Sequence, residues 1–127
     1  AALTMKKLIG VFLLAPTVAF AAPPPVATQE IAHLFSYLKD SGCAFNRNST
    51  WYSATEAVTH LQTKHDYLIK KDHISSTEDF IALAATESSM SGKPYLVKCA
   101  DGAAVSSGLW FRDELARYRK ELPGKRS

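Results

Sequence analysis

Apolar side chains recur along this chain with two periods, one typical of helices and one typical of strands. Residues three and four apart lie on one face of a helix, whereas alternate residues share one face of a strand. The helical period appears in four stretches and the alternating period in two short ones. This order predicts a single α+β domain of about four helices around a small antiparallel strand pair.

The first two helices have distinct start and stop signals. The first is predicted over Glu30–Asp40, with Thr28 as its cap and Gly42 as its end. The second follows Ser53-Ala54-Thr55-Glu56, a capping box in which serine and glutamate each bind the other's backbone amide, and it extends to about Lys71. The stripes that we expect to face the core are Ile31, Leu34, Phe35 and Leu38 in the first helix, and Ala54, Ala57, Val58, Leu61, His65 and Leu68 in the second.

The third and fourth helices follow serine-rich caps. Ser75–Asp79 offers two overlapping caps for the third helix, which Gly92 is expected to end and Pro94 prevents from continuing. Serines at 106 and 107 can cap the last helix, which we predict to end at Leu122, before a proline.

The strands are predicted at Cys43–Arg47 and Pro94–Cys99, with a further short strand at 103–105. The intervening run at 46–50 is rich in turn formers. Trp51-Tyr52 lies between that turn and the second helix. We interpret it as a hydrophobic staple for the helix start, with a ligand-binding surface as the alternative.

The N-terminal residues have the features of a secretory signal. From Met5 a Lys6-Lys7 pair precedes an apolar run and a small-x-small site that ends at Ala21. The apolar run is shorter than the roughly 20 residues that a membrane span needs. We therefore expect a signal peptide at 1–21, a proline-rich spacer at 22–29, one globular domain at 30–122 and a basic tail at 123–127, with a periplasmic location and no membrane span after cleavage.

Removing the leader changes the charge balance. The whole chain has 15 Lys and Arg against 12 Asp and Glu, and the leader carries Lys6 and Lys7 but no acid, which leaves 13 against 12. The mature domain is thus almost neutral, at +1. Its charge gives no support for nucleic-acid binding.

The two cysteines, Cys43 and Cys99, are expected to form one disulfide, because exported proteins meet an oxidising environment. The alternative is a pair of reduced cysteines in the core. If they pair, the two predicted strands come together.

The sequence lacks the standard enzyme motifs. It has no G-x-S-x-G, no phosphate-binding loop, no H-E-x-x-H and no C-x-x-C. His60 and His65 are five residues apart on one helix, which puts them on different sides and makes them poor joint metal ligands. We expect no metal and no cofactor. One enzymatic alternative remains, a small hydrolase in which Ser89 or Ser91 near Gly92 uses His60 as its base.

Five motifs follow one another in a characteristic order. They are Ser41-Gly42-Cys43-x-Phe45-x-Arg47-Asn48, Trp51-Tyr52, Ala57-x-x-His60-Leu61-x-x-Lys64, Asp79-Phe80-Ile81 and Ser88-Ser89-x-Ser91-Gly92-x-Pro94-Tyr95-x-Val97-x-Cys99. This ordered set resembles the YfeK-like family of small exported bacterial proteins, a domain of unknown function. The resemblance covers about Glu30 to Arg119 and implies a periplasmic single domain with a disulfide, without an activity or an assigned site.

A second similarity concerns five residues. Ser91-Gly92-Lys93-Pro94-Tyr95 has the S-G-x-x-Y form found in periplasmic lysozyme inhibitors, where the motif lies on a loop that enters the lysozyme cleft. Those inhibitors are largely β, unlike the helical pattern of this chain. The similarity implies a lysozyme-inhibitor alternative.

Our leading functional hypothesis is a non-enzymatic binding or envelope-maintenance module. Its partner would be a periplasmic protein or an envelope ligand that the sequence does not identify. Aromatic and arginine side chains are favoured at binding surfaces. The candidate binding residues are Arg47, Trp51, Tyr52, His60, Ser91 and Tyr95.

Overall fold

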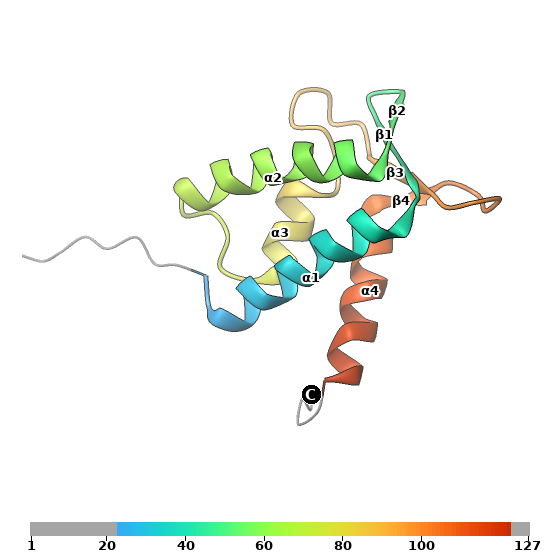
Figure 1. Cartoon of the computed structure of the whole chain (residues 1–127). Helices are drawn as coiled ribbons and strands as arrows, with labels where there is room; N and C mark the ends of the chain where they lie inside the picture. The colour runs from blue at the N-terminus through green and yellow to red at the C-terminus, as the bar shows by residue number, and fades with distance from the viewer. Residues whose placement is uncertain (1–22, 123–127) are drawn as a thin grey trace, which may run out of the picture.

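The computed structural model describes residues 23–122 and shows an α+β domain (Figure 1). The predicted leader at 1–21 and the predicted basic tail at 123–127 lie outside the described residues. The elements are α1 (Pro25–Ser41), β1 (Ala44–Arg47), β2 (Thr50–Tyr52), α2 (Ala54–Lys70), α3 (Thr77–Ala84), β3 (Leu96–Lys98), β4 (Val105–Ser106) and α4 (Ser107–Glu121).

The strands form one antiparallel sheet in the order β2-β1-β3-β4. The predicted pairing of the two central strands is confirmed, with Phe45 opposite Val97. Trp51 and Tyr52, predicted to lie between a turn and a helix, belong to β2, a strand that was not predicted, and pair with β1. The physical cause is the two-residue turn Asn48-Ser49, whose positive φ angles of 52° and 69° fold the chain back as a hairpin.

α1 begins at Pro25, five residues before the predicted start. A proline suits the first helical position, because its missing N–H would have no partner there and its φ is already helical. Thr28 is therefore inside the helix, where its amide donates to the carbonyl of Pro24, and is not its cap. The end of the helix is as predicted, at Gly42 with a φ of 69°.

α2 has the predicted capping box, whereas α3 is shorter than predicted. The chain leaves α3 at Ala84 and forms a loop before β3, and Gly92, with a φ of 73°, turns that loop and ends no helix. Thr86 lies where the helix stops. Its hydroxyl donates to the carbonyl of Ile81, and its own carbonyl accepts from the amide of Tyr95 in place of a helical partner.

The sheet lies at one end of the helical layer, where α1 leads into β1, β2 leads into α2 and β4 leads into α4 (Figure 1). The side chains that fill the space between helices and sheet are almost completely buried, which fixes the relative positions of α2 and the sheet. The largest apolar side chains among them are Leu34, Leu38, Phe45, Leu61, Ile74, Phe80, Ile81, Tyr95 and Phe111.

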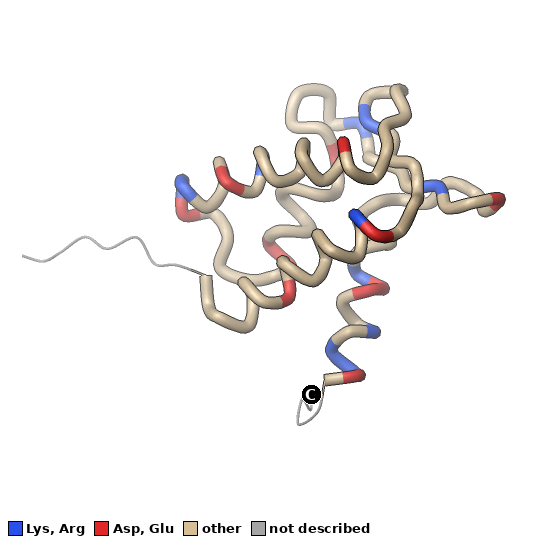
Figure 2. The backbone as a smooth tube through the Cα atoms, in the orientation of Figure 1, with Lys and Arg blue, Asp and Glu red and all other residues tan. Residues whose placement is uncertain are grey.

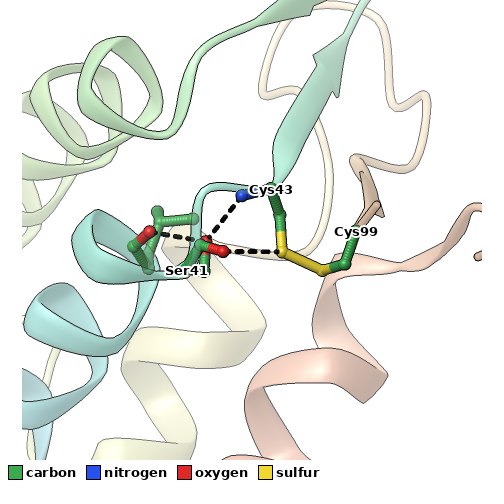
Figure 3. The surroundings of a disulfide bond; sticks show 4 residues. Ser41, Cys43 and Cys99 are labelled. Atoms are coloured by element: carbon green, nitrogen blue, oxygen red, sulfur yellow. Dashed lines mark hydrogen bonds between the residues drawn. A yellow bond between two sulfur atoms is a disulfide. The ribbon is translucent and has the colours of Figure 1, made fainter. Parts of the chain in front are cut away.

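The predicted disulfide joins Cys43, just before β1, to Cys99, just after β3, with 4.3 Å between their Cα atoms (Figure 3). The hydroxyl of Ser41 accepts a hydrogen bond from the amide of Cys43, which holds the chain where α1 passes into the sheet. The bond spans 56 residues and so ties the front of the domain to its middle.

Charges of both signs are interspersed along α4 (Figure 2). Arg119 uses two of its nitrogens to bind the carboxylate of Glu30 on α1, at 2.7 and 2.9 Å, and also binds Glu78 on α3. Glu30 is only 2% exposed, and it accepts a further hydrogen bond from Thr77. The buried carboxylate of Glu30 thus links α1 to α3 and α4. Within residues 23–122, no helix combines the length and the apolar character that crossing a membrane requires.

Candidate functional site

Four of the predicted binding residues meet around one hydrogen-bond cluster. Arg47 at the end of β1 donates from Nε to Nε2 of His60 on α2, at 3.0 Å. Its Nη1 donates to the hydroxyl of Tyr52 on β2, at 3.3 Å. The same Nε2 of His60 lies 3.2 Å from the hydroxyl of Tyr95, which immediately precedes β3. The sheet and the first half of α2 thus bring together residues that are up to 48 positions apart in the sequence.

A fifth residue, Lys64, was not among the predicted binding residues. It lies one helical turn after His60, and its Nζ donates to the Tyr95 hydroxyl at 3.1 Å and to the carbonyl of Glu87 at 2.9 Å. Nζ also lies 5.0 Å from the centre of the Tyr95 ring. The i, i+4 spacing of His60 and Lys64 could have suggested it. We call Arg47, His60 and Lys64 the basic cluster.

The donors and acceptors of the cluster form a directed chain. A lysine ammonium has only donors, so the Tyr95 oxygen accepts from Lys64 and its own O–H points toward His60. Arg47 also has only donors, so Nε2 of His60 accepts from it. His60 is therefore neutral in this arrangement, with its proton on Nδ1, and it acts as the common acceptor.

The electrostatics agree with a neutral His60. Burial, together with the charges of Arg47 and Lys64, lowers the pKa of His60 below its ordinary value of 6.5. Burial also lowers the pKa of Lys64, an effect that Glu87 opposes and Arg47 reinforces. Burial raises the pKa of Tyr95, against the influence of Arg47. The cluster thus holds positive charge in a partly desolvated setting.

Two adjoining hollows open beside the cluster, and both are lined by Arg47 and His60. The small hollow has a volume of about 130 Å³ and lies against Lys64 and the loop that follows α3. The large hollow has a volume of about 390 Å³ and lies along the first half of α2. The other polar residues that line the small one are Asn48, Ser88, Ser89 and Tyr95, and those that line the large one are Tyr52, Glu56, Thr59 and Thr63.

The cations of this cluster differ from Arg117 and Arg119 of α4. Arg117 and Arg119 each bind carboxylates in ion pairs. Within residues 23–122, neither Arg47 nor Lys64 forms an ion pair with a carboxylate, and both are held instead by neutral side chains and a backbone carbonyl. Their charge remains available to a bound anion.

Trp51 and Ser91 do not join this cluster. Trp51 is 45% exposed and lies opposite Asn46, so strand alternation puts both on the face of the sheet away from Phe45 and Tyr52. Ser91 binds the side chain of Asn48 and thereby attaches the loop after α3 to the β1–β2 turn. The six predicted binding residues therefore do not form one surface. Arg47, Tyr52, His60 and Tyr95 lie together, whereas Trp51 and Ser91 lie apart from them.

Over residues 23–122, the structure does not have the geometry that the lysozyme-inhibitor and serine-hydrolase alternatives require. Tyr95 is 1% exposed, so Ser91-Gly92-x-x-Tyr95 does not present serine and tyrosine together on an exposed loop. Nε2 of His60 is used by Arg47 and Tyr95, and no hydrogen bond within the described range joins His60 to Ser89 or Ser91.

The part of the chain that the structure describes contains neither a free thiol nor a metal-binding cluster. Both cysteines are consumed by the disulfide, which leaves no thiolate. Nowhere within 23–122 do three or more His, Cys, Asp or Glu side chains gather closely enough to hold a metal ion.

A hollow of about 450 Å³ between α1 and α2 is of a different kind. Apolar residues such as Ile31, Phe35 and Ile69 line it together with His65, and no Lys, Arg, Asp or Glu does. Its polar side chains, Thr28, Gln62 and His65, are neutral or weakly basic, whereas the basic cluster has two permanent charges, so we take the basic cluster as the candidate site.

Residues 25–119 match the sequence profile of DUF5329, a family of unknown function. The chain belongs to this family. No curated protein and no solved structure matches the chain significantly. The DUF5329 match includes every residue of the basic cluster and both cysteines, but it brings no activity, ligand or catalytic residue with it.

Proposed function

We propose that this protein is a non-enzymatic binding module that acts outside the cytoplasm and takes an anionic group, a carboxylate or a phosphate, at the basic cluster. The observation that carries the proposal is the convergence of Arg47 and Lys64 on one small hollow, with neutral partners and without a carboxylate ion pair among residues 23–122. Anions that replace water at such a place gain charge-assisted hydrogen bonds, which are stronger than neutral ones.

The geometry of the small hollow fits one oxyanion group. A guanidinium has five N–H donors, of which His60 and Tyr52 engage two. Lys64 adds a second charged donor, and Ser89 and Asn48 line the same hollow. Partial burial strengthens each of these interactions, because fewer water molecules screen them.

Two features support a location outside the cytoplasm. The sequence at 1–21 has the features of a secretory signal, and the disulfide is typical of oxidising compartments. The residues that resemble the YfeK-like family all lie within the DUF5329 match, which supports treating the two groups as one. The anionic ligand would then be a component of the bacterial envelope or of the space around it, and the role would be envelope maintenance.

Isothermal titration of the purified, disulfide-bonded protein with acetate and with inorganic phosphate tests the proposal. We expect saturable binding of at least one of them, weakened about tenfold or more in Arg47→Gln and in Lys64→Gln, because each removes a charge-assisted hydrogen bond. Arg112→Gln on α4 and Lys70→Gln on α2 are matched controls and should bind like the parent protein.

Binding that is equal in all five proteins would mean that the anion does not bind at the basic cluster. The absence of any binding by the parent protein would reject the proposed function as well.

A further inference from the structure

The large hollow carries opposite charges on its wall. Arg47 and Glu56 both line it, yet no ion pair joins them. Side chains of opposite charge that share a small space usually pair when they can reach each other. Here Arg47 is held back by His60 and Tyr52, and Glu56 is held by the capping box of α2.

The capping box fixes Glu56 where it is. Its Oε1 accepts a hydrogen bond from the amide of Ser53 at 2.9 Å, and the Ser53 hydroxyl accepts from the amide of Glu56 at 3.1 Å. A carboxylate has two oxygens with about four acceptor positions, so this bond leaves acceptor capacity for a second partner. Glu56 is thus a positioned acceptor at the rim of the hollow.

The rest of that wall also accepts hydrogen bonds. The hydroxyls of Thr59 and Thr63 donate to the backbone carbonyls of Thr55 and Thr59, at 3.3 and 3.1 Å. With its single proton used in this way, each hydroxyl presents lone pairs to a ligand. The hollow therefore has an accepting, negative wall on α2 and a donating, positive side at Arg47.

We propose that the ligand is a zwitterion, an amino acid or a short peptide with both termini free. The ligand would span the two adjoining hollows. Its carboxylate would lie in the small hollow at Arg47 and Lys64, and its ammonium group would lie in the large hollow at Glu56, with the threonine hydroxyls as further acceptors. This inference rests on the proposed anion-binding function and adds the second, cationic end of the ligand. The volume of about 390 Å³ lies within the range of small-molecule sites.

Matched ligands test the inference on the unmodified protein. Alanyl-alanine has both charges, N-acetyl-alanyl-alanine lacks the ammonium, alanyl-alanine amide lacks the carboxylate, and glucuronate offers hydroxyls in place of the ammonium. We expect alanyl-alanine to bind about tenfold or more tightly than each of the other three, because each lacks one charge-assisted contact.

The outcomes separate the two proposals. If the N-acetyl peptide or glucuronate binds as tightly as alanyl-alanine, the zwitterion inference is overturned and the anion site stands. If the amide binds as tightly as alanyl-alanine, the carboxylate makes no contribution and the anion-binding function itself is overturned. If none of the four binds, the zwitterion inference is overturned, and the anion-binding function is overturned with it only if acetate and phosphate also fail to bind.

Glu56→Gln provides an independent test, since glutamine also forms a capping box and the helix start is kept. We expect the variant to lose about tenfold in affinity for alanyl-alanine while its affinity for the N-acetyl peptide is unchanged, with Asp113→Asn on α4 as the control. An equal loss for both peptides, or no loss for either, would contradict a role for Glu56 as the ammonium partner. The comparison of ligands on the unmodified protein remains decisive if the variant does not fold.

Discussion

Arg47 donates its Nε–H to Nε2 of His60 at 3.0 Å, so a strand and a helix are joined by a charged donor and a neutral histidine. This bond requires the histidine to stay unprotonated on Nε2, because a guanidinium cannot accept a hydrogen bond. Tyr95 uses the same nitrogen, and Lys64 binds Tyr95 in turn. Protonation of this imidazole would therefore break the bond from Arg47 and place a third positive charge beside Arg47 and Lys64.

This arrangement predicts that stability depends on pH through His60. Its pKa is below 6.5 in the folded protein, because of burial and the charges of Arg47 and Lys64, whereas the unfolded chain has the ordinary value. Below about pH 6.5 the unfolded state therefore binds more protons, and the free energy of unfolding decreases as the pH falls toward the folded pKa. Urea unfolding between pH 8 and 5 should show this slope in the parent protein and less of it in His60→Gln. Equal slopes would contradict the assignment.

Removing the disulfide should destabilise the domain strongly. The bond closes a loop of 56 residues, for which the chain-entropy model gives about 4 kcal/mol. We expect Cys43→Ala/Cys99→Ala to lower the free energy of unfolding in urea by about this amount. Circular dichroism and fluorescence should both be used to follow the unfolding transition. A loss of less than about 1 kcal/mol would mean that the unfolded chain is hardly restricted by the bond.

The ion pair between Glu30 and Arg119 should affect the free energy of unfolding mainly because a buried carboxylate without its partner is costly. Arg119→Met would deprive a buried carboxylate of its guanidinium, and we expect a loss of about 3 kcal/mol. Glu30→Met/Arg119→Met should regain much of that loss, since no buried charge is left unpaired. Arg112→Met on the same helix is the control. Additive effects of the two single changes in a double-mutant cycle would show that the pair is not coupled.

The β1–β2 turn offers a change that should stabilise the protein. Both of its central residues have a positive φ, which suits Asn48 but is unfavourable for Ser49, at 69°. Ser49→Gly should raise the free energy of unfolding by about 1 kcal/mol, because glycine adopts this conformation without steric cost. Thermal unfolding measures the change, and Ser53→Gly, which removes a helix cap, should act in the opposite direction. A neutral or destabilising Ser49→Gly would indicate that this φ is not strained.

The sequence was informative wherever one local signal decided the structure. The capping box of α2, the glycine at the end of α1 and the pairing of Cys43 with Cys99 were all predicted correctly. Each depends on chemistry within a few residues or, for the disulfide, on the only two cysteines in the chain.

The errors arose where local signals competed or where distant segments met. Ser88 had helical spacing, but α3 ends before it, where the Thr86 hydroxyl binds the carbonyl of Ile81 and the Thr86 carbonyl pairs with Tyr95. Lys64 was missed because its site depends on Tyr95 and Glu87, which lie 31 and 23 residues away. Trp51 was assigned to the wrong face because the turn at Asn48 made it part of a strand, and strand alternation then separated it from Tyr52.

The most direct test of the account is to follow the amide and side-chain NMR signals of the disulfide-bonded protein during titration with inorganic phosphate. Anion binding at the basic cluster predicts saturable shifts centred on Arg47, His60, Lys64 and Tyr95, which disappear in Arg47→Gln and persist in Arg112→Gln. Shifts that grow linearly with phosphate, or that are spread over the lysines and arginines of α4 instead, would contradict a binding site at this cluster.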